Sequence, residues 1–292
     1  MAASPEIRTY GFVINEDLLE RLQLFIADWQ QLLSLQLQDC EAITIASDYS
    51  GFVRYFDTGF GPQEQPEVSE RGVGFTPETL RSGKLGSHVI FPSTTIDAFD
   101  GKSAELSPDE ARNVIVHELA HADEHRRTAQ VFWDEVLALH SAGTDGIQIG
   151  RKAVWNEYYV CRTVAEVNPG TVTLLESSVK QTIEEFGNDC STARRRAAAT
   201  GNPERVTSDL WSSAFRFFLD AARLLGHLDG LGLKFADQCP AVEDYLKQER
   251  MIETFEQLHN ALKKLWKCYP NWEGLGDLDT IAQIINLRLS KI

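Results

Sequence analysis

Two histidines and a glutamate lie close together in an apolar stretch near the middle of the chain. The run VIVHELAH, residues 114–121, contains an HExxH motif. Two imidazoles four residues apart project from one face of a helix, close enough to share a metal ion. The glutamate beside the first histidine lies toward the same edge and can hold a metal-bound water. His117 and His121 as ligands and Glu118 as base are the minimal apparatus of a zinc hydrolase.

The helix that carries the motif is expected to begin at Ser107 and to end near residue 128. Ser107 suits the N-cap, Pro108 suits the first helical position, and Glu110 completes a capping box. The motif therefore falls in the middle of a helix. Three histidines follow one stripe of this helix, which is costly on a core-facing surface unless a metal or another partner neutralises them.

A catalytic zinc needs a third protein ligand and an open position for water. The downstream candidates are Asp134, Glu135, His140, Asp145, Glu157 and Glu166. Glu157 is preferred because its helical neighbours are apolar, and a carboxylate in an apolar stripe is expensive to bury without a cation. A bound metal would supply that cation. Asp145 and His140 remain the main alternatives.

Further side chains are candidates for supporting roles. His125 lies two turns beyond His117, about 12 Å along the helix axis, which is too far for a ligand of the same ion. A role beside the ligands or the substrate is expected for it, with plain packing as the alternative. The reaction also needs an oxyanion partner. Tyr158, Tyr159 and Arg162 are candidates, although each can equally pack or pair at the surface.

The residues before the motif predict a mixed α/β arrangement. A helix is expected to open at Asn15, and the strand 88–91 is expected to end or lie at a sheet edge because Pro92 cannot donate to a ladder. An extended peptide could add to such an edge by backbone hydrogen bonds. The other expected elements are strands at 42–46, 52–56 and 73–75 and an exposed loop at 61–72.

Beyond the motif the pattern is helical. Helices are expected near 129–141, 149–167, 171–199, 204–229, 240–267 and 275–290. The predicted fold class is α+β and zincin-like: a small N-terminal mixed sheet with an edge strand over the active-site helix, followed by a mostly helical C-terminal region. We expect a metallopeptidase domain over 1–170, with 171–292 packed on it.

The bulk composition excludes several classes of protein. The formal net charge is −15, so phosphate backbones are repelled and nucleic acid is not an expected partner. Neither a secretory signal nor an apolar run long enough for a membrane span is recognisable. Five widely spaced cysteines without a CxxC pair argue against a disulfide framework and against a cysteine zinc site. A cytoplasmic location is expected.

The motif and the helix around Glu157 resemble known zinc peptidases. The Asn156-Glu157-Tyr158-Tyr159 run resembles the glutamate helix of gluzincin-type zincins. The HELAHADEH run, residues 117–125, is similar to the HExxHxxxH form of the ImmA/IrrE-like metallopeptidases. Those are cytosolic bacterial or phage proteins in which a zinc peptidase cuts a regulatory partner. The resemblance covers roughly residues 85–168 and implies the same three ligands and the same base.

The expected function is therefore zinc-dependent hydrolysis of a peptide bond in a specific protein partner. Glu118 would take a proton from the metal-activated water and deliver it to the leaving amine. Two alternatives share the same ligands. One is a metal-dependent hydrolase of a non-peptide amide or ester, and the other is a non-catalytic zinc-binding interaction protein.

Overall fold

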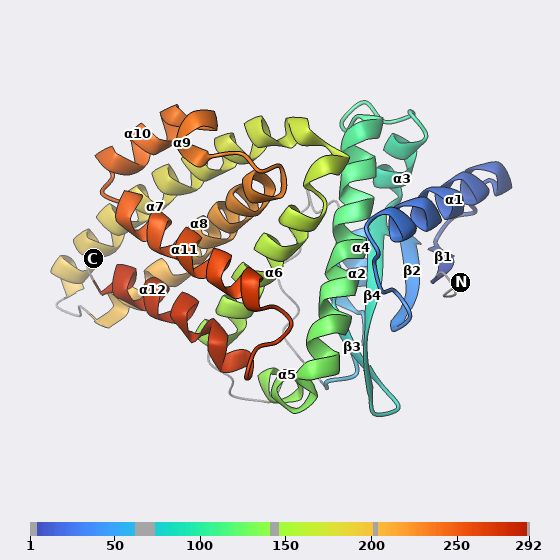
Figure 1. The fold of residues 1–292 in the computed structure, drawn as a ribbon, viewed down its shortest axis with the longest axis horizontal. Coiled ribbons are helices and arrows are strands. Elements are labelled where there is room, and N and C mark those ends of the chain that lie inside the picture. The colour runs from blue at the N-terminus through green and yellow to red at the C-terminus, as the bar shows by residue number, and fades with distance from the viewer. Residues whose placement is uncertain (1–4, 62–73, 141–145, 201–203, 291–292) are drawn as a thin grey trace. The chain divides into compact units, whose positions relative to one another are not determined.

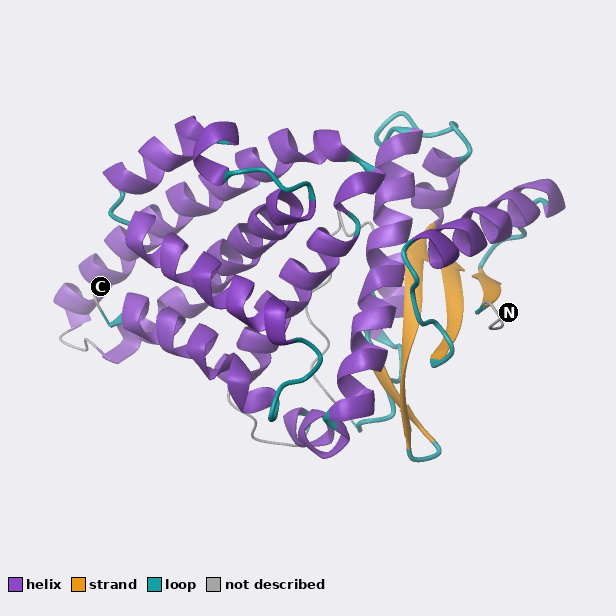
Figure 2. Cartoon of the chain, in the orientation of Figure 1, coloured by secondary structure: helices purple, strands orange, loops and turns teal. Residues whose placement is uncertain are grey.

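The computed structural model describes residues 5–61, 74–140, 146–200 and 204–290. The chain divides into two compact units, Met1–Ala142 and Gly143–Ile292. In the described parts, the strands belong to the first unit and the second unit is helical (Figures 1 and 2). The sequence placed the boundary after residue 170. In the structure the boundary between the compact units follows residue 142, so the helix that carries Glu157 belongs to the same unit as the C-terminal helices.

The first unit is built on a four-stranded mixed sheet, so the α+β fold class is confirmed. The strand order is β1-β2-β4-β3, with β1, β2 and β4 parallel and β3 antiparallel to β4. Its elements are β1 (Glu6–Tyr10), α1 (Glu16–Leu32), β2 (Cys40–Ala46), α2 (Tyr49–Arg54), β3 (Glu78–Arg81), β4 (Lys84–Pro92), α3 (Ser93–Phe99), α4 (Pro108–Val131) and α5 (Trp133–Leu139).

The helix α4 carries the HExxH motif and packs along β4 (Figure 1). Its predicted start is confirmed in detail. The amide of Glu110 donates to Ser107 Oγ at 3.2 Å, and the amide of Ser107 donates to a Glu110 carboxylate oxygen at 2.8 Å. This reciprocal capping box satisfies amides that have no partner inside the helix. The first turn is therefore fixed, and the motif lies in the interior of the helix.

The prediction that 88–91 forms a strand is confirmed, but its placement at an edge is wrong. β4 pairs with β2 on one side and with β3 on the other. Farther along, Ile90 and Phe75 exchange both backbone hydrogen bonds at 2.9 Å. Pro92 is compatible with this inner position because it is the last residue of the strand, where the ladder ends.

The predicted strand at 52–56 is also wrong, because this segment belongs to the helix α2 and the turn after it. Tyr49, Phe52, Val53 and Phe56 recur at helical spacing, and Asp48 caps the first turn by accepting from the amide of Gly51 at 2.9 Å. The apolar side of this segment covers Ile90 of the sheet. Most of the predicted loop at 61–72, and Val73, lie outside the described residues.

Short segments beside β4 distinguish the two faces of the sheet. Phe75 packs with Ile90 and the α2 residues Tyr49 and Val53. The neighbouring Thr76 contacts the α4 side chain of Glu118 instead. Because alternate residues of an extended segment point to opposite faces, α2 covers one face and α4 covers the other.

The second unit is a helical assembly in which α8 packs against α6 and α7. Its helices are α6 (Gly146–Thr163), α7 (Val172–Thr200), α8 (Glu204–Gly230), α9 (Phe235–Gln238), α10 (Pro240–Gln248), α11 (Ile252–Cys268) and α12 (Asp279–Leu289). The predicted helix at 240–267 is in fact two helices. Arg250, with φ of 56°, adopts the left-handed conformation that ends α10 before α11 begins.

No helix in the described part of the chain combines the length and apolar character needed to cross a bilayer.

Removing the cap of α4 tests how strongly this helix depends on its first turn. Ser107→Ala deletes the side chain that accepts from Glu110, so we expect a loss of about 1 kcal/mol in the free energy of unfolding. Urea denaturation followed by circular dichroism measures it. Ser107→Asp retains an N-cap acceptor and is expected to stay near wild type. Equal stability of Ser107→Ala and wild type would contradict the assigned cap.

Candidate metal centre

The imidazoles of His117 and His121 face each other across one turn of α4. Their Nε2 atoms are 3.2 Å apart, and their ring centroids are 4.8 Å apart with the planes at 77°. Two nitrogens bound to one tetrahedral zinc at about 2.0–2.1 Å lie roughly 3.3 Å from each other. The observed separation of the two nitrogens therefore matches that of two ligands of a single ion.

The carboxylate of Glu118 is oriented by the extended segment that passes α4. Thr76 Oγ1 donates a hydrogen bond to Glu118 Oε2 at 2.7 Å. Gly74 lies against the same side chain, and a Cβ added to it would be 2.6 Å from Glu118 Cγ. The two neighbours thus hold the carboxylate by one hydrogen bond and by close packing that requires glycine.

The turn of α4 that follows His121 is anchored to the loop between α1 and β2. Asp123 accepts from the amide of Gln36 at 2.6 Å and from Arg127 Nε at 2.8 Å. An aspartate that accepts from both a backbone amide and a guanidinium is well compensated for its burial. This contact fixes the rotation of the helix, and with it the direction of the two imidazoles.

His125 lies next to the pair, with its ring centroid 6.1 Å from that of His121. His140, an alternative third ligand, is occupied within the first unit. Its Nε2 is 2.8 Å from Glu78 Oε2, and its ring stacks on Phe60 with centroids 3.8 Å apart. Asp145, the other alternative, lies outside the described residues.

Glu157, the preferred third ligand, lies on α6 in the second unit and is paired with an arginine of α8. Arg223 donates through Nε to Oε2 at 2.9 Å and through Nη2 to Oε1 at 2.8 Å. The carboxylate raises the pKa of Arg223 above its already high usual value. Bidentate pairing uses one lone-pair site on each oxygen, so both oxygens keep acceptor capacity.

Arg223 is itself held by a second carboxylate. Its Nη1 donates to Asp220 Oδ1 at 3.0 Å, and Ser178 on α7 donates to Asp220 Oδ2 at 2.9 Å. The series Ser178, Asp220, Arg223 and Glu157 therefore connects three helices of the second unit. This series fixes the orientation of the Glu157 carboxylate.

The candidates for an oxyanion partner lie in a polar and aromatic cluster of the second unit. Tyr158 donates to Asp229 at 2.7 Å and accepts from Arg162 at 2.6 Å. Burial acts to raise the pKa of Asp229, but hydrogen bonds from His259 and Tyr158 hold it below its usual range. Arg162 also stacks on Trp266, with its guanidinium carbon 4.4 Å from the ring centroid. An oxyanion role for Tyr158 or Arg162 would require these contacts to open.

Tyr159 lies in the neighbouring aromatic cluster. Its ring centroid is 5.3 Å from that of Tyr269 and 5.5 Å from that of Trp266. Tyr159 is buried against these rings, which is the geometry of a packing residue.

Sequence reasoning did not identify Thr76, Gly74 or Arg223. The first two lie in an irregular stretch whose distance from α4 is set by tertiary structure. Arg223 is far from Glu157 in the chain, and a single sequence carries no signal that pairs them. The one hint in the sequence is that Glu157 has apolar helical neighbours. A carboxylate buried among them is costly unless a cation compensates its charge.

Comparison with models of protein families, with curated proteins and with solved structures found no match to this chain.

The ion pair between Glu157 and Arg223 is expected to contribute measurably to the free energy of unfolding. Arg223→Met removes the guanidinium that pairs with both oxygens of Glu157, so we expect the free energy of unfolding to fall by about 1–3 kcal/mol. This range is reduced from that of a fully buried pair because Arg223 is 36% exposed. Chemical denaturation measures it.

Arg216→Met provides the matched control. Arg216 also pairs with a glutamate, Glu185, at 2.9 Å, but its side chain is 55% exposed. We expect this variant to lose less than about 1 kcal/mol. A loss in Arg223→Met no larger than in the control would contradict a structural role for the pair.

Proposed function

We propose that the protein is a zinc-dependent metallopeptidase. The observation that carries the proposal is the 3.2 Å separation of the His117 and His121 Nε2 atoms beside an oriented Glu118. Glu157 is the proposed third ligand. It belongs to the other compact unit, so its approach to the histidines is itself part of the proposal.

The chemical division of labour follows from the residue types. A zinc ion held by these residues would lower the pKa of a coordinated water and polarise a substrate carbonyl. Glu118 takes a proton from the attacking water and later delivers it to the leaving amine. Thr76 restricts the carboxylate to the direction from which it can make both transfers. His125 is proposed to support the neighbouring His121.

A peptide-binding edge is proposed beside the base. Phe75 exchanges both backbone hydrogen bonds with Ile90, which directs the amides and carbonyls of Gly74 and Thr76 to the outer side of the segment. An extended substrate could add to these groups within reach of Glu118. The edge that the sequence assigned to β4 is therefore proposed for this segment instead.

This edge favours a peptide substrate over a non-peptide amide or ester. Only a peptide has the repeated amide and carbonyl groups that form a ladder of backbone hydrogen bonds. The resemblance to ImmA/IrrE-like peptidases supports a regulatory protein as the substrate and a cytoplasmic location. A zinc-binding interaction protein without activity has no use for a base held in this way, so that alternative is less well supported.

The ligand set is tested by metal content. After reconstitution with zinc and desalting, we expect about one zinc per chain in wild type and in Glu118→Gln, and a loss in His117→Ala and Glu157→Ala, because only the latter two remove a ligand. Elemental analysis measures it. Glu185→Gln, which removes a carboxylate outside the proposed site and leaves all proposed ligands and their supporting contacts in place, is the control. Full occupancy in Glu157→Ala would overturn its assignment as a ligand.

The role of Glu118 as the base is tested by a substitution that places extra atoms against its side chain. Gly74→Ala places a methyl group against Glu118, so we expect hydrolysis of a substrate found by peptide-library profiling to fall by at least about tenfold, with zinc content unchanged. Gly170→Ala, whose added Cβ meets its nearest neighbour at an ordinary 3.4 Å, is the control. Wild-type rates in Gly74→Ala would argue against the proposed position of the base.

A further inference from the structure

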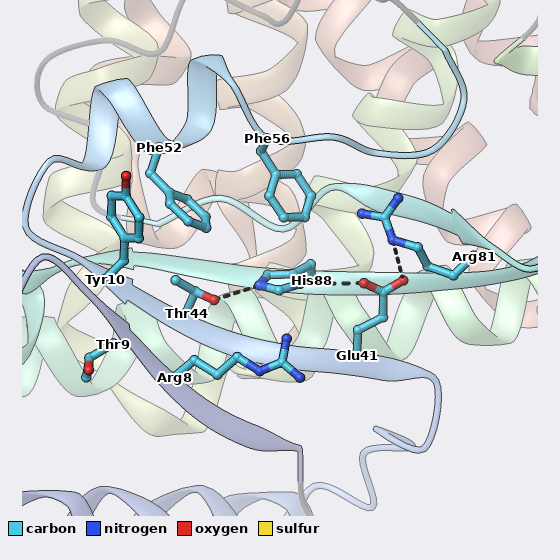
Figure 3. A pocket seen from close by; sticks show the side chains of 9 residues that line it. All are labelled: Arg8, Thr9, Tyr10, Glu41, Thr44, Phe52, Phe56, Arg81 and His88. Carbon is cyan, nitrogen blue, oxygen red and sulfur yellow. Dashed lines mark hydrogen bonds and ion pairs between the residues drawn. The ribbon is translucent and has the colours of Figure 1, made fainter.

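A pocket of about 370 Å³ lies on the first unit, on the face of the sheet covered by α2 (Figure 3). Phe75 and Ile90 face this side, whereas Thr76 and the Glu118 base lie on the other. The pocket is thus separated from the proposed catalytic residues by the sheet. Its volume falls at the lower end of the range for small-molecule sites.

The floor of the pocket consists of polar side chains from the two inner strands. Thr44 Oγ1 and His88 Nε2 are hydrogen-bonded at 2.8 Å, and His88 Nδ1 lies 3.7 Å from a Glu41 carboxylate oxygen. The shift of the β2 register between Cys40 and Ile43 allows Glu41 and Thr44 to line the same cavity. His88 is only 5% exposed, and its Nδ1 has no hydrogen-bond partner among the described residues.

Burying the polar side chains of this floor costs free energy unless they bind something. On the same face, Ile90 joins an apolar cluster with α2, so an apolar side chain at position 88 would continue that core at lower cost. Burial lowers the pKa of His88, which leaves its imidazole neutral near pH 7. The positive charge of the pocket therefore comes from elsewhere.

Guanidinium groups reach the pocket from both edge strands. Arg8 extends from β1 and Arg81 from β3, and both lie near the carboxylate of Glu41 (Figure 3). Arg81 Nε is 3.4 Å from a Glu41 oxygen. Two cations and one carboxylate leave an excess of positive charge among the lining residues.

The outer partners of these arginines are exposed carboxylates. Arg8 pairs with Glu6 at 2.6 Å, and Arg81 pairs with Asp57 at 3.5 Å. Glu6 and Asp57 are 64% and 81% exposed. Exposed pairs contribute little, so a ligand carboxylate that enters the pocket can replace them.

The remaining wall is aromatic. The ring centroids of Tyr10 and Phe52 are 5.1 Å apart, those of Phe52 and Phe56 are 5.9 Å apart, and those of Phe56 and His88 are 4.8 Å apart. Rings at these separations and tilts offer both faces and edges to a planar group. The pocket therefore combines an apolar, ring-shaped side with a cationic side.

We propose that this pocket binds a small organic ligand that carries a planar ring and a carboxylate. The ring lies against Phe52 and Phe56, and the carboxylate is bound by Arg8 and Arg81. The hydrogen-bonded pair Thr44–His88 forms the polar base of the site. This site does not depend on the proposed zinc chemistry.

The test uses 4-fluorophenylacetate as the probe and follows its fluorine NMR line on titration with the purified full chain. We expect saturable binding with a dissociation constant of roughly millimolar size, as is usual for so small a ligand. The matched neutral probe is 4-fluorophenylacetamide, and the cationic probe is 4-fluorophenethylamine. Both are expected to bind at least about tenfold more weakly because they lack the negative charge that the arginines bind.

Variants locate the binding. Arg8→Gln is expected to weaken 4-fluorophenylacetate by about tenfold, because one charge-assisted contact is lost at an exposed position that folding does not require. Arg112→Gln, which removes an exposed arginine of α4, is expected to have no effect. Three results would each overturn the proposal: no saturable binding of the carboxylate, equal or tighter binding of the amide or the amine, or unchanged binding in Arg8→Gln.

Discussion

The close approach of two imidazole nitrogens on α4 is the constraint on which the rest of the proposed site depends. Nitrogens 3.2 Å apart must either share a proton or face a common cation, because two lone pairs or two N–H groups at this distance repel. The capping box at Ser107 and the anchor at Asp123 fix the position and rotation of the helix. Thr76, in the extended segment before β3, orients the base Glu118. Local interactions thus place the ligands, and tertiary contacts place the proton acceptor.

Glu157 shows a different solution to the cost of a carboxylate among apolar side chains. The apolar neighbours in the sequence call for a compensating cation, and Arg223 supplies one within the second unit. The ligand role of Glu157 therefore no longer follows from a missing counter-charge. It is supported by the acceptor sites that bidentate pairing leaves on each oxygen, and by an orientation held through Asp220 and Ser178.

The predictable parts of the fold were those encoded over short distances. The cap and length of α4, the strand within β4 and the long C-terminal helices follow from turn chemistry and periodicity. The failures have physical causes. The aromatic residues of α2 are of types that favour a strand, although their spacing is helical. The edge strands β1 and β3 are short and polar and have no apolar pattern that predicts them. Thr76 contacts Glu118, and Arg223 contacts Glu157, across long stretches of sequence, and a single sequence carries no signal for such pairs.

The central claim is that one zinc ion is bound by two imidazoles and by oxygen, with no sulfur. X-ray absorption spectroscopy at the zinc edge of the reconstituted full chain tests it most directly. The account predicts two imidazole nitrogens at about 2.0–2.1 Å and oxygen ligands at similar distance. The chain contains five cysteines, whose thiolates could compete for the ion. A sulfur shell near about 2.3 Å, or a first shell with fewer than two imidazoles, would contradict it.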